Sequence, residues 1–214
     1  MTLSEILEAF NRRVEDVVGL QAWPEPEKIL FANQAEREAC ERAKLLQDII
    51  TIPVTAGKET YKLHPKTLEV HSVALDGRFL TGVSRTRLDE LHPRGWNTKT
   101  GRPELFIDPY QRSLTTFPIP VADGSLEVVF YRYPVEDMAN PDDEPEVDER
   151  FHFDMIDWME YLAYSKNDPE TQDLEAAKRA AANFASKFGV KIDANVRRQQ
   201  RDRRSHQVRF NPNW

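Results

Sequence analysis

Apolar residues recur at three- and four-residue intervals in the first 18 residues of the chain, and this spacing predicts an amphipathic helix. Thr2 and Glu5 form a capping box, which satisfies the free backbone N–H groups at the start of such a helix. Gly19 is expected to end it. The apolar stripe consists of Leu3, Leu7, Phe10, Val14 and Val17.

A second helix is predicted from Pro24 to about Leu46, because proline and acidic residues suit a first helical turn. One of its faces consists of small residues, so neighbouring backbones can approach closely and the helix is expected to lie between others. Cys40 is predicted to be a buried structural thiol rather than a nucleophile, because no motif supplies a histidine or amide partner. As the single cysteine, it excludes an internal disulfide. The small residues are Ala32, Ala35, Ala39 and Ala43.

From Ile49 the pattern changes to short strand-like segments separated by turn signals. Asp76-Gly77 predicts a hairpin between two of them. The spacing predicts an antiparallel β-domain of about six or seven strands, a sandwich or a barrel. A short helical turn ending at Trp96 is expected within it. The predicted strands are ITIPV, ETYKL, EVHSVAL, RFLTGV, ELFID, SLTTF and LEVVFYRY.

The segment 135–148 is rich in proline and acid and is predicted to be an exposed linker. The helix predicted after it, from Glu149 to Lys166, is apolar on nearly every side, as is typical of a helix buried in a core or between subunits. A last helix is expected to begin at Asp168 and to end at Gly189. The candidates for subunit or core packing are Phe151, Met155, Trp158, Met159 and Leu162.

These elements predict an α+β fold with a four-helix scaffold and an inserted antiparallel β-domain. Residues 1–48 form one helical pair and residues 149–190 complete the bundle. The β-domain occupies residues 49–134 and is followed by the acidic linker 135–148. Residues 191–214 form an extended basic tail.

Charge is divided unevenly between the body and this tail. The formal net charge is −7, and residues 191–214 hold seven basic and two acidic side chains, a net of +5. The first 190 residues therefore carry −7 − 5 = −12. A body this acidic repels nucleic-acid phosphates.

The tail is predicted to dock on a partner and to be disordered in the free subunit, because it offers little apolar area to offset its ordering entropy. Arginine binds carboxylates as well as phosphates, so the charge alone does not select DNA. Val208 and Phe210 alternate with polar residues, as an added β-strand requires. The candidate docking residues are Arg197, Arg198, Arg201, Arg203, Arg204, Val208, Arg209, Phe210 and Trp214.

Candidate chemistry is sparse. The sequence contains no glycine-rich phosphate loop, no G-x-S-x-G elbow and no zinc spacing of its histidines. His152 lies near three acids, Asp154, Asp157 and Glu160, which are expected to form a solvated or subunit-facing stripe rather than a metal site. Trp96 is expected to be a core or interface residue rather than part of a glycan site. The chain is predicted to be no enzyme, with no cofactor and no metal. Neither a membrane span nor a signal peptide is indicated.

Several segments, in order, resemble head-to-tail connector (adaptor or neck) proteins of tailed bacteriophages, similar to tail tubular protein A-like adaptors. "EPEVDERFHFDMIDWMEYLAYSKNDPETQDLEAAKRAAANFASKFG" resembles their C-terminal helical pair. "NQAEREACERAKLLQD" resembles their second helix, and "YKLHPKTLEVHSVALDGRFL" and "GWNTKTGRPELFIDPYQRSLTTFPIP" resemble their β-region.

The resemblance implies a structural virion protein in the neck between capsid and tail. Its relatives form a ring, usually of twelve copies, between the portal vertex and the tail or nozzle proteins. Genomic DNA passes through the channel without sequence-specific binding, the C-terminal segments dock on the portal protein, and no membrane is involved. Two other functions stay open: a nucleic-acid-binding packaging accessory factor that uses the tail arginines, and a receptor- or glycan-binding tail component that uses the β-domain.

Overall fold

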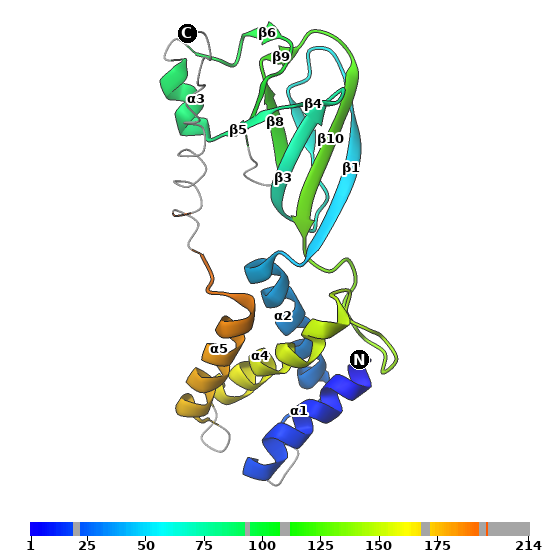
Figure 1. Cartoon of the computed structure of the whole chain (residues 1–214), viewed down its shortest axis with the longest axis vertical. Coiled ribbons are helices and arrows are strands. Elements are labelled where there is room, and N and C mark those ends of the chain that lie inside the picture. Colours follow the sequence, from blue (N-terminus) through cyan, green and yellow to red (C-terminus); the bar gives the residue numbers. More distant parts are fainter. Residues whose placement is uncertain (19–21, 93–94, 108–111, 168–171, 193–195, 197–214) are drawn as a thin grey trace, which may run out of the picture. The chain divides into compact units, whose positions relative to one another are not determined.

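The computed structural model describes residues 1–18, 22–92, 95–107, 112–167, 172–192 and 196. Two compact units emerge from its contacts (Figure 1). The helical unit comprises Met1–Leu46 and Arg132–Lys191, and the β-unit contains Gln47–Tyr131. The fold is α+β, with five helices and three small sheets in the described residues.

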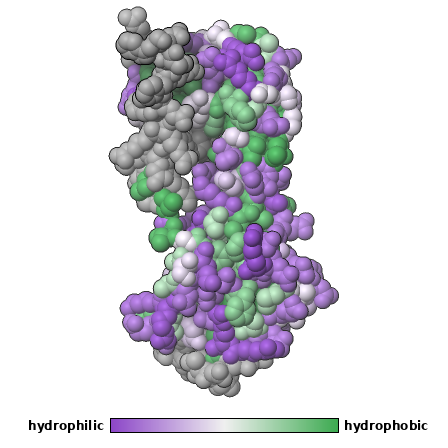
Figure 2. Space-filling model, in the orientation of Figure 1, coloured by the Kyte–Doolittle hydropathy of each residue, from purple (hydrophilic) through white to green (hydrophobic). Residues whose placement is uncertain are grey.

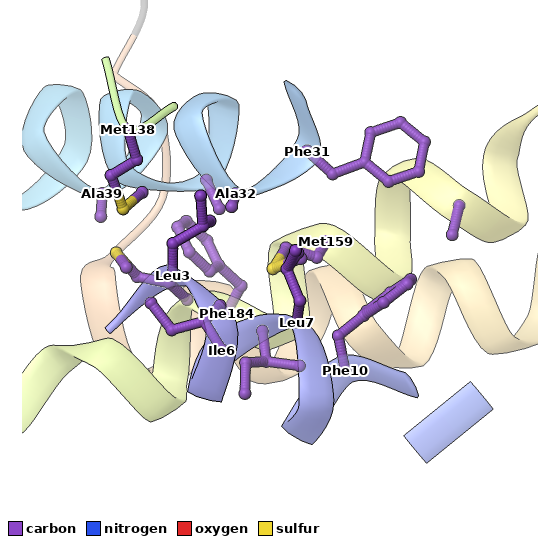
Figure 3. Packing of buried hydrophobic residues seen from close by; sticks show 14 of the residues in the cluster. Leu3, Ile6, Leu7, Phe10, Phe31, Ala32, Ala39, Met138, Met159 and Phe184 are labelled. Carbon is purple, nitrogen blue, oxygen red and sulfur yellow. The ribbon is translucent and has the colours of Figure 1, made fainter. Parts of the chain in front are cut away.

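The helical unit is built around α4 (His152–Ser165), which follows a short 3-10 turn, η1 (Glu149–Phe151). It packs against α1 (Leu3–Val18), α2 (Glu25–Ala43) and α5 (Leu174–Phe188). Figure 3 shows side chains of α1 directed into the space between these helices, where they meet residues from each of them. The fully buried members labelled there include Leu3, Ile6, Phe10, Ala32, Ala39, Met159 and Phe184.

Local sequence signals predicted some helix ends correctly and others incorrectly. The capping box is confirmed: the Thr2 N–H donates to Glu5 Oε2 at 2.9 Å, and the Glu5 N–H donates to Thr2 Oγ1 at 3.3 Å. The second helix was predicted too long, because Lys44 takes a left-handed conformation (φ 54) and Leu46 already begins a strand.

The predicted start of the last helix at Asp168 is wrong. α5 begins at Leu174, where the Asp173 carboxylate accepts hydrogen bonds from the N–H groups of Glu175 and Ala176. Asp168 lies outside the described residues. Gly189 follows the helix with φ 85, as the sequence predicted.

The segment 135–148 is irregular and mostly exposed, as the sequence predicted, but a few of its residues anchor it to the helical unit. Met138 and Val147 are buried in the core of the helical unit. The buried Asn33 amide accepts a hydrogen bond from the Met138 N–H (2.8 Å) and donates one to the Met138 carbonyl (2.9 Å). The carbonyls of Pro141 and Asp143 accept from N–H groups of the first turn of α1. Two apolar side chains and these polar partners suffice to order the segment, although its composition is that of a loop.

The β-unit has three open sheets in the described residues, so of the two predicted alternatives, sandwich and barrel, the barrel is wrong. One sheet has the order β1-β10-β3-β4 and another the order β2-β8-β7-β5, while β6 and β9 pair separately. The strands are β1 (Leu46–Val54), β2 (Thr60–Lys62), β3 (Thr67–Leu75), β4 (Arg78–Phe79), β5 (Thr81–Val83), β6 (Thr100–Gly101), β7 (Leu105–Ile107), β8 (Ser113–Phe117), β9 (Ile119–Pro120) and β10 (Gly124–Arg132).

The pairing is mixed rather than purely antiparallel, since β5–β7 and β6–β9 are parallel. The predicted strand RFLTGV divides at the buried Leu80, whose N–H donates to the Val73 carbonyl, while the Thr81 N–H donates to the Glu104 carbonyl. The chain therefore crosses from one sheet to the other at this point. Buried side chains of both four-stranded sheets form one cluster.

Two turn predictions in the β-unit can be compared with the structure. Asp76 (φ 48) and Gly77 (φ 78) both have positive φ and form the predicted hairpin turn between β3 and β4. The helical turn expected to end at Trp96 is α3 (Arg85–Leu91), which ends earlier. It covers a small second cluster that includes Leu88 and Phe117.

Candidate functional site

Of the five predicted packing residues, four belong to α4 and Phe151 belongs to η1, and they differ in burial. Met155 and Met159 are fully buried in the core of the helical unit. Phe151, Trp158 and Leu162 are half-buried and pack against the same core. All five thus contact the interior of this subunit.

The half-buried part of α4 is an aromatic margin shared with α5. The Trp158 ring centroid lies 5.0 Å from that of Phe184 and 4.4 Å from that of Tyr161. The Arg42 guanidinium covers the Trp158 ring at 4.6 Å. Phe153 is different, because it is 53% exposed; the Arg13 guanidinium lies over its ring, 4.6 Å from the centroid. The visible face of the helical unit is mostly hydrophilic, with small apolar areas among polar ones (Figure 2).

The acidic stripe of α4, predicted to be solvated or subunit-facing, is partly covered within its own subunit. Asp157 is buried, and the Arg13 guanidinium donates to Asp157 Oδ1 at 2.7 Å and to Glu160 Oε1 at 3.1 Å. Burial opposes the charge on Arg13, but the hydrogen bonds to both carboxylates outweigh it and raise the pKa of the guanidinium. Burial likewise raises the pKa of Glu160, although Arg13 counteracts this shift. The stripe therefore joins α1 to α4.

His152 belongs to the packing of the helical unit. Its Nδ1 lies 2.9 Å from the N-terminal amino nitrogen, and its Nε2 lies 2.8 Å from the Val147 carbonyl oxygen. Both ring nitrogens are thus engaged. Across the described residues, no group of three or more His, Cys, Asp or Glu side chains could hold a metal ion.

Glu36 is a carboxyl group buried on the inner side of α2. It is 1% exposed, and its Oε1 accepts a hydrogen bond from the Val147 N–H at 3.3 Å. Burial raises its pKa to about 7, and the charges of Glu146 and Asp137 add to this, while backbone hydrogen bonds counteract it. The neighbouring Cys40 is buried as predicted, and burial raises the pKa of its thiol to about 12. Such a thiol is a poor nucleophile.

A cavity of about 410 Å³ opens between the first turns of α1 and α2 and the segment at Ala139–Pro141. Lys28 on its wall is only 8% exposed, and its Nζ donates to Asn11 Oδ1 at 2.8 Å. Trp23, also on the wall, is 3% exposed, and its Nε1 has no hydrogen-bond partner in the described part of the chain. The apolar part of the wall consists of Leu3, Leu7 and Ile29.

In the β-unit, Trp96 packs rather than forming an open platform. Its half-buried ring meets the Phe117 ring edge-on, with centroids 6.1 Å apart, and its Nε1 donates to Asp89 Oδ1 at 2.7 Å. This hydrogen bond holds Trp96 against α3.

The family model for the SU10 adaptor protein matches residues 1–211 of the 214-residue chain. This chain belongs to the SU10 adaptor protein family. The match covers both units of the adaptor and most of its tail, which confirms the resemblance to phage adaptors. A structural role in the virion agrees with the prediction of a non-enzymatic protein. Among curated proteins, none matches the chain significantly.

The nine predicted docking residues of the adaptor's tail, from Arg197 to Trp214, lie outside the described residues. Within the described residues, no helix combines the length and apolar character that a membrane span requires.

Sequence reasoning missed the polar residues of the helical unit, namely Arg13, Lys28 and Glu36. Lys28 carries a usable signal, since it stands one helical turn before Ala32 on the buried small-residue face of α2. Arg13 and Glu36 carry no such sequence signal, because their hydrogen-bond partners lie more than 100 residues away along the chain.

Proposed function

We propose that this adaptor forms a ring of twelve copies that joins the portal vertex to the tail and surrounds the DNA channel. The observation that carries the proposal is the match to the adaptor family over residues 1–211, which includes both units. The partners are the portal protein on one side and tail or nozzle proteins on the other. The place of function is the neck of the virion.

The helical unit is the natural place for contacts between copies. Its α4 buries Met155 and Met159 inside the subunit, but exposed large apolar side chains remain on three helices of the unit. They are Leu30 on α2, Phe153 on α4 and Leu174 on α5. Rigid helices hold such side chains at fixed positions, which favours a repeated contact with a neighbouring copy.

The charge of the body suits a channel wall that DNA passes without being held. The first 190 residues carry a net charge of −12. Proteins that hold DNA neutralise its phosphates with clustered Lys and Arg, and this body has an excess of the opposite sign. An accessory factor that packages DNA would therefore have to bind it with the tail alone.

The basic tail is the segment that docks on the portal. About 24 extended residues reach roughly 80 Å, at about 3.3 Å each, which is enough to leave one ring and enter the next. The arginines between Arg197 and Arg204 would bind carboxylates of the portal, while Val208 and Phe210 add a short strand and Trp214 fills a pocket.

The test is a truncation that removes residues 197–214. We expect the shortened adaptor to keep its far-ultraviolet circular dichroism and its melting temperature, and to lose binding to purified portal rings in sedimentation. A matched variant that replaces the five arginines from 197 to 204 with lysine keeps the charge and removes the planar guanidinium fork. It should bind the portal more weakly than the intact chain.

Other outcomes favour the other functions. Normal docking of the truncated adaptor together with loss of DNA affinity would support the accessory factor. Docking that depends on neither the tail nor the helical unit would leave a receptor-binding role for the β-unit.

A further inference from the structure

Lys191, the last residue of the helical unit, is held by two carboxylates of α2. Its Nζ donates to Glu41 Oε2 at 3.1 Å and to Glu38 Oε2 at 3.3 Å. Burial opposes the charge on Lys191, but the hydrogen bonds and charges of the two carboxylates outweigh it and raise the pKa of the ammonium group. The chain that leaves α5 is therefore bound to α2 at this residue. We call Lys191, Glu38 and Glu41 the tail anchor.

Both carboxylates of the tail anchor are oriented by other residues. Arg42 Nε donates to Glu38 Oε1 at 2.9 Å, and the Tyr133 hydroxyl donates to Glu41 Oε2 at 3.3 Å. The side chains of Glu38 and Glu41 are only 13% and 22% exposed. An isolated surface ion pair contributes little, in part because two mobile side chains must be ordered to form it. Here the acceptors are already held in place, so only the lysine has to be ordered.

The tail anchor fixes the position of a segment that adds nothing to the apolar core. Val190 and Ile192, on either side of Lys191, are 77% and 47% exposed. In the part of the chain that the structure describes, no apolar side chain after Phe188 is buried. The anchor therefore determines where the chain leaves the helical unit, and it does so without apolar packing.

This position bears directly on the reach of the tail. Arg197, the first arginine of the tail, follows Lys191 by six residues, which span at most about 20 Å. Without the anchor, the last buried residue is Phe188, nine residues before Arg197, or about 30 Å. The effective concentration of a tethered segment falls roughly as the −3/2 power of the tether length. Loss of the anchor should therefore lower that of each tail about twofold.

We propose that Lys191 is a positioning residue for portal docking, which fixes the point from which the tail leaves the subunit by binding Glu38 and Glu41. The inference rests on the proposed docking of the tail on the portal protein, and it adds the contact that directs the tail. None of the three residues has to touch the portal.

A spin label next to Lys191 tests whether the tail anchor forms in solution. Ile192→Cys in the full-length adaptor provides the labelling site, and the buried Cys40 should not react. Electron paramagnetic resonance should show restricted motion of the label, and freer motion after Lys191→Glu or Glu41→Lys. The double variant Lys191→Glu/Glu41→Lys exchanges the two charges and should restore part of the restriction.

Binding to purified portal rings, measured by sedimentation, tests the positioning role. Lys191→Glu and Glu41→Lys should each lower the affinity at least threefold, because the loss for each tail multiplies when several tails of a ring dock together. The double variant should bind better than either single variant. Glu41→Lys is the decisive case, because it adds positive charge. Simple attraction between a basic tail and an acidic portal would make it bind more tightly.

Lys187→Glu is the matched control. Lys187 lies in the last turn of α5, is 56% exposed against 51% for Lys191, and pairs with Asp154 at 3.7 Å rather than with the tail anchor. Its substitution changes the net charge by the same amount. Label motion and portal affinity should both stay as in the unsubstituted adaptor. Circular dichroism should show that every variant is folded.

The outcomes separate the anchor from the proposed function. Unchanged label motion after Lys191→Glu would show that the anchor does not form in solution, and the inference would fall. Freer motion with unchanged portal affinity would overturn the positioning role, as would tighter binding of Glu41→Lys. Failure of the unsubstituted adaptor to bind portal rings would instead contradict the proposed function itself.

Discussion

Replacing Glu36 with glutamine should change how the stability of the helical unit depends on pH. The carboxyl group is 1% exposed and accepts a hydrogen bond from the Val147 N–H, which holds the segment 135–148 against α2. Glutamine has nearly the same shape and keeps an oxygen acceptor for this N–H. It differs from glutamate in that it cannot ionise.

The sign of the effect follows from the pKa. Folding raises the pKa of Glu36 from 4.5 to about 7, so between these values the native state binds more protons than the unfolded state. The free energy of unfolding therefore falls as the pH rises through this window and levels off above about pH 7. A difference of 2.5 pKa units, at about 1.36 kcal/mol each, corresponds to about 3 kcal/mol.

Urea unfolding, followed by the helical signal at 222 nm at pH 5, 6, 7 and 8, measures this difference. Part of this difference has already developed at pH 5, so Glu36→Gln should gain about 2.5 kcal/mol relative to the unsubstituted protein between pH 5 and pH 8, whatever its packing costs at a single pH. Glu144→Gln, an exposed acid of the same segment, should follow the unsubstituted protein. Identical pH profiles for Glu36→Gln and the unsubstituted protein would show that the buried carboxyl is ionised in the folded state across this range, and the reasoning would fail.

Two further substitutions examine the same unit by urea unfolding. Asn33→Ala removes both hydrogen bonds to the buried Met138 backbone and should cost roughly 2–4 kcal/mol. A loss near zero would mean that these hydrogen bonds contribute little. Met159→Ala leaves a cavity at a fully buried site and should lower the free energy of unfolding by about 2–5 kcal/mol. The control Met159→Leu keeps most of the volume and should cost less than about 1.5 kcal/mol. A similarly small cost for Met159→Ala would contradict the packing at α4.

Helix starts and hairpin turns were predictable where their signals are local. The Thr2–Glu5 capping box and the turn at Asp76-Gly77 involve residues three or fewer positions apart, and both are present. The end of α2 was not predictable, because helix and strand patterns overlap at Leu46. Leu80 illustrates a limit of strand prediction, since alternation alone does not show that the chain changes sheets.

Residues that depend on distant partners escaped prediction. The burial of Met138 requires Asn33, 105 residues earlier, and the acidic side of α4 is covered by Arg13, 144 residues from Asp157. Composition predicted the exposure of most of segment 135–148, but not the burial of Met138 and Val147. The candidate cavity escaped for the same reason, since its walls come from two helices and a loop.

A reconstruction of the virion neck by electron cryomicroscopy tests the central claim most directly. The account predicts twelve copies of this chain in a ring between portal and tail, joined through their helical units, with residues after Lys191 in contact with the portal. Isolated copies, or copies that touch one another only through their β-units, would contradict it.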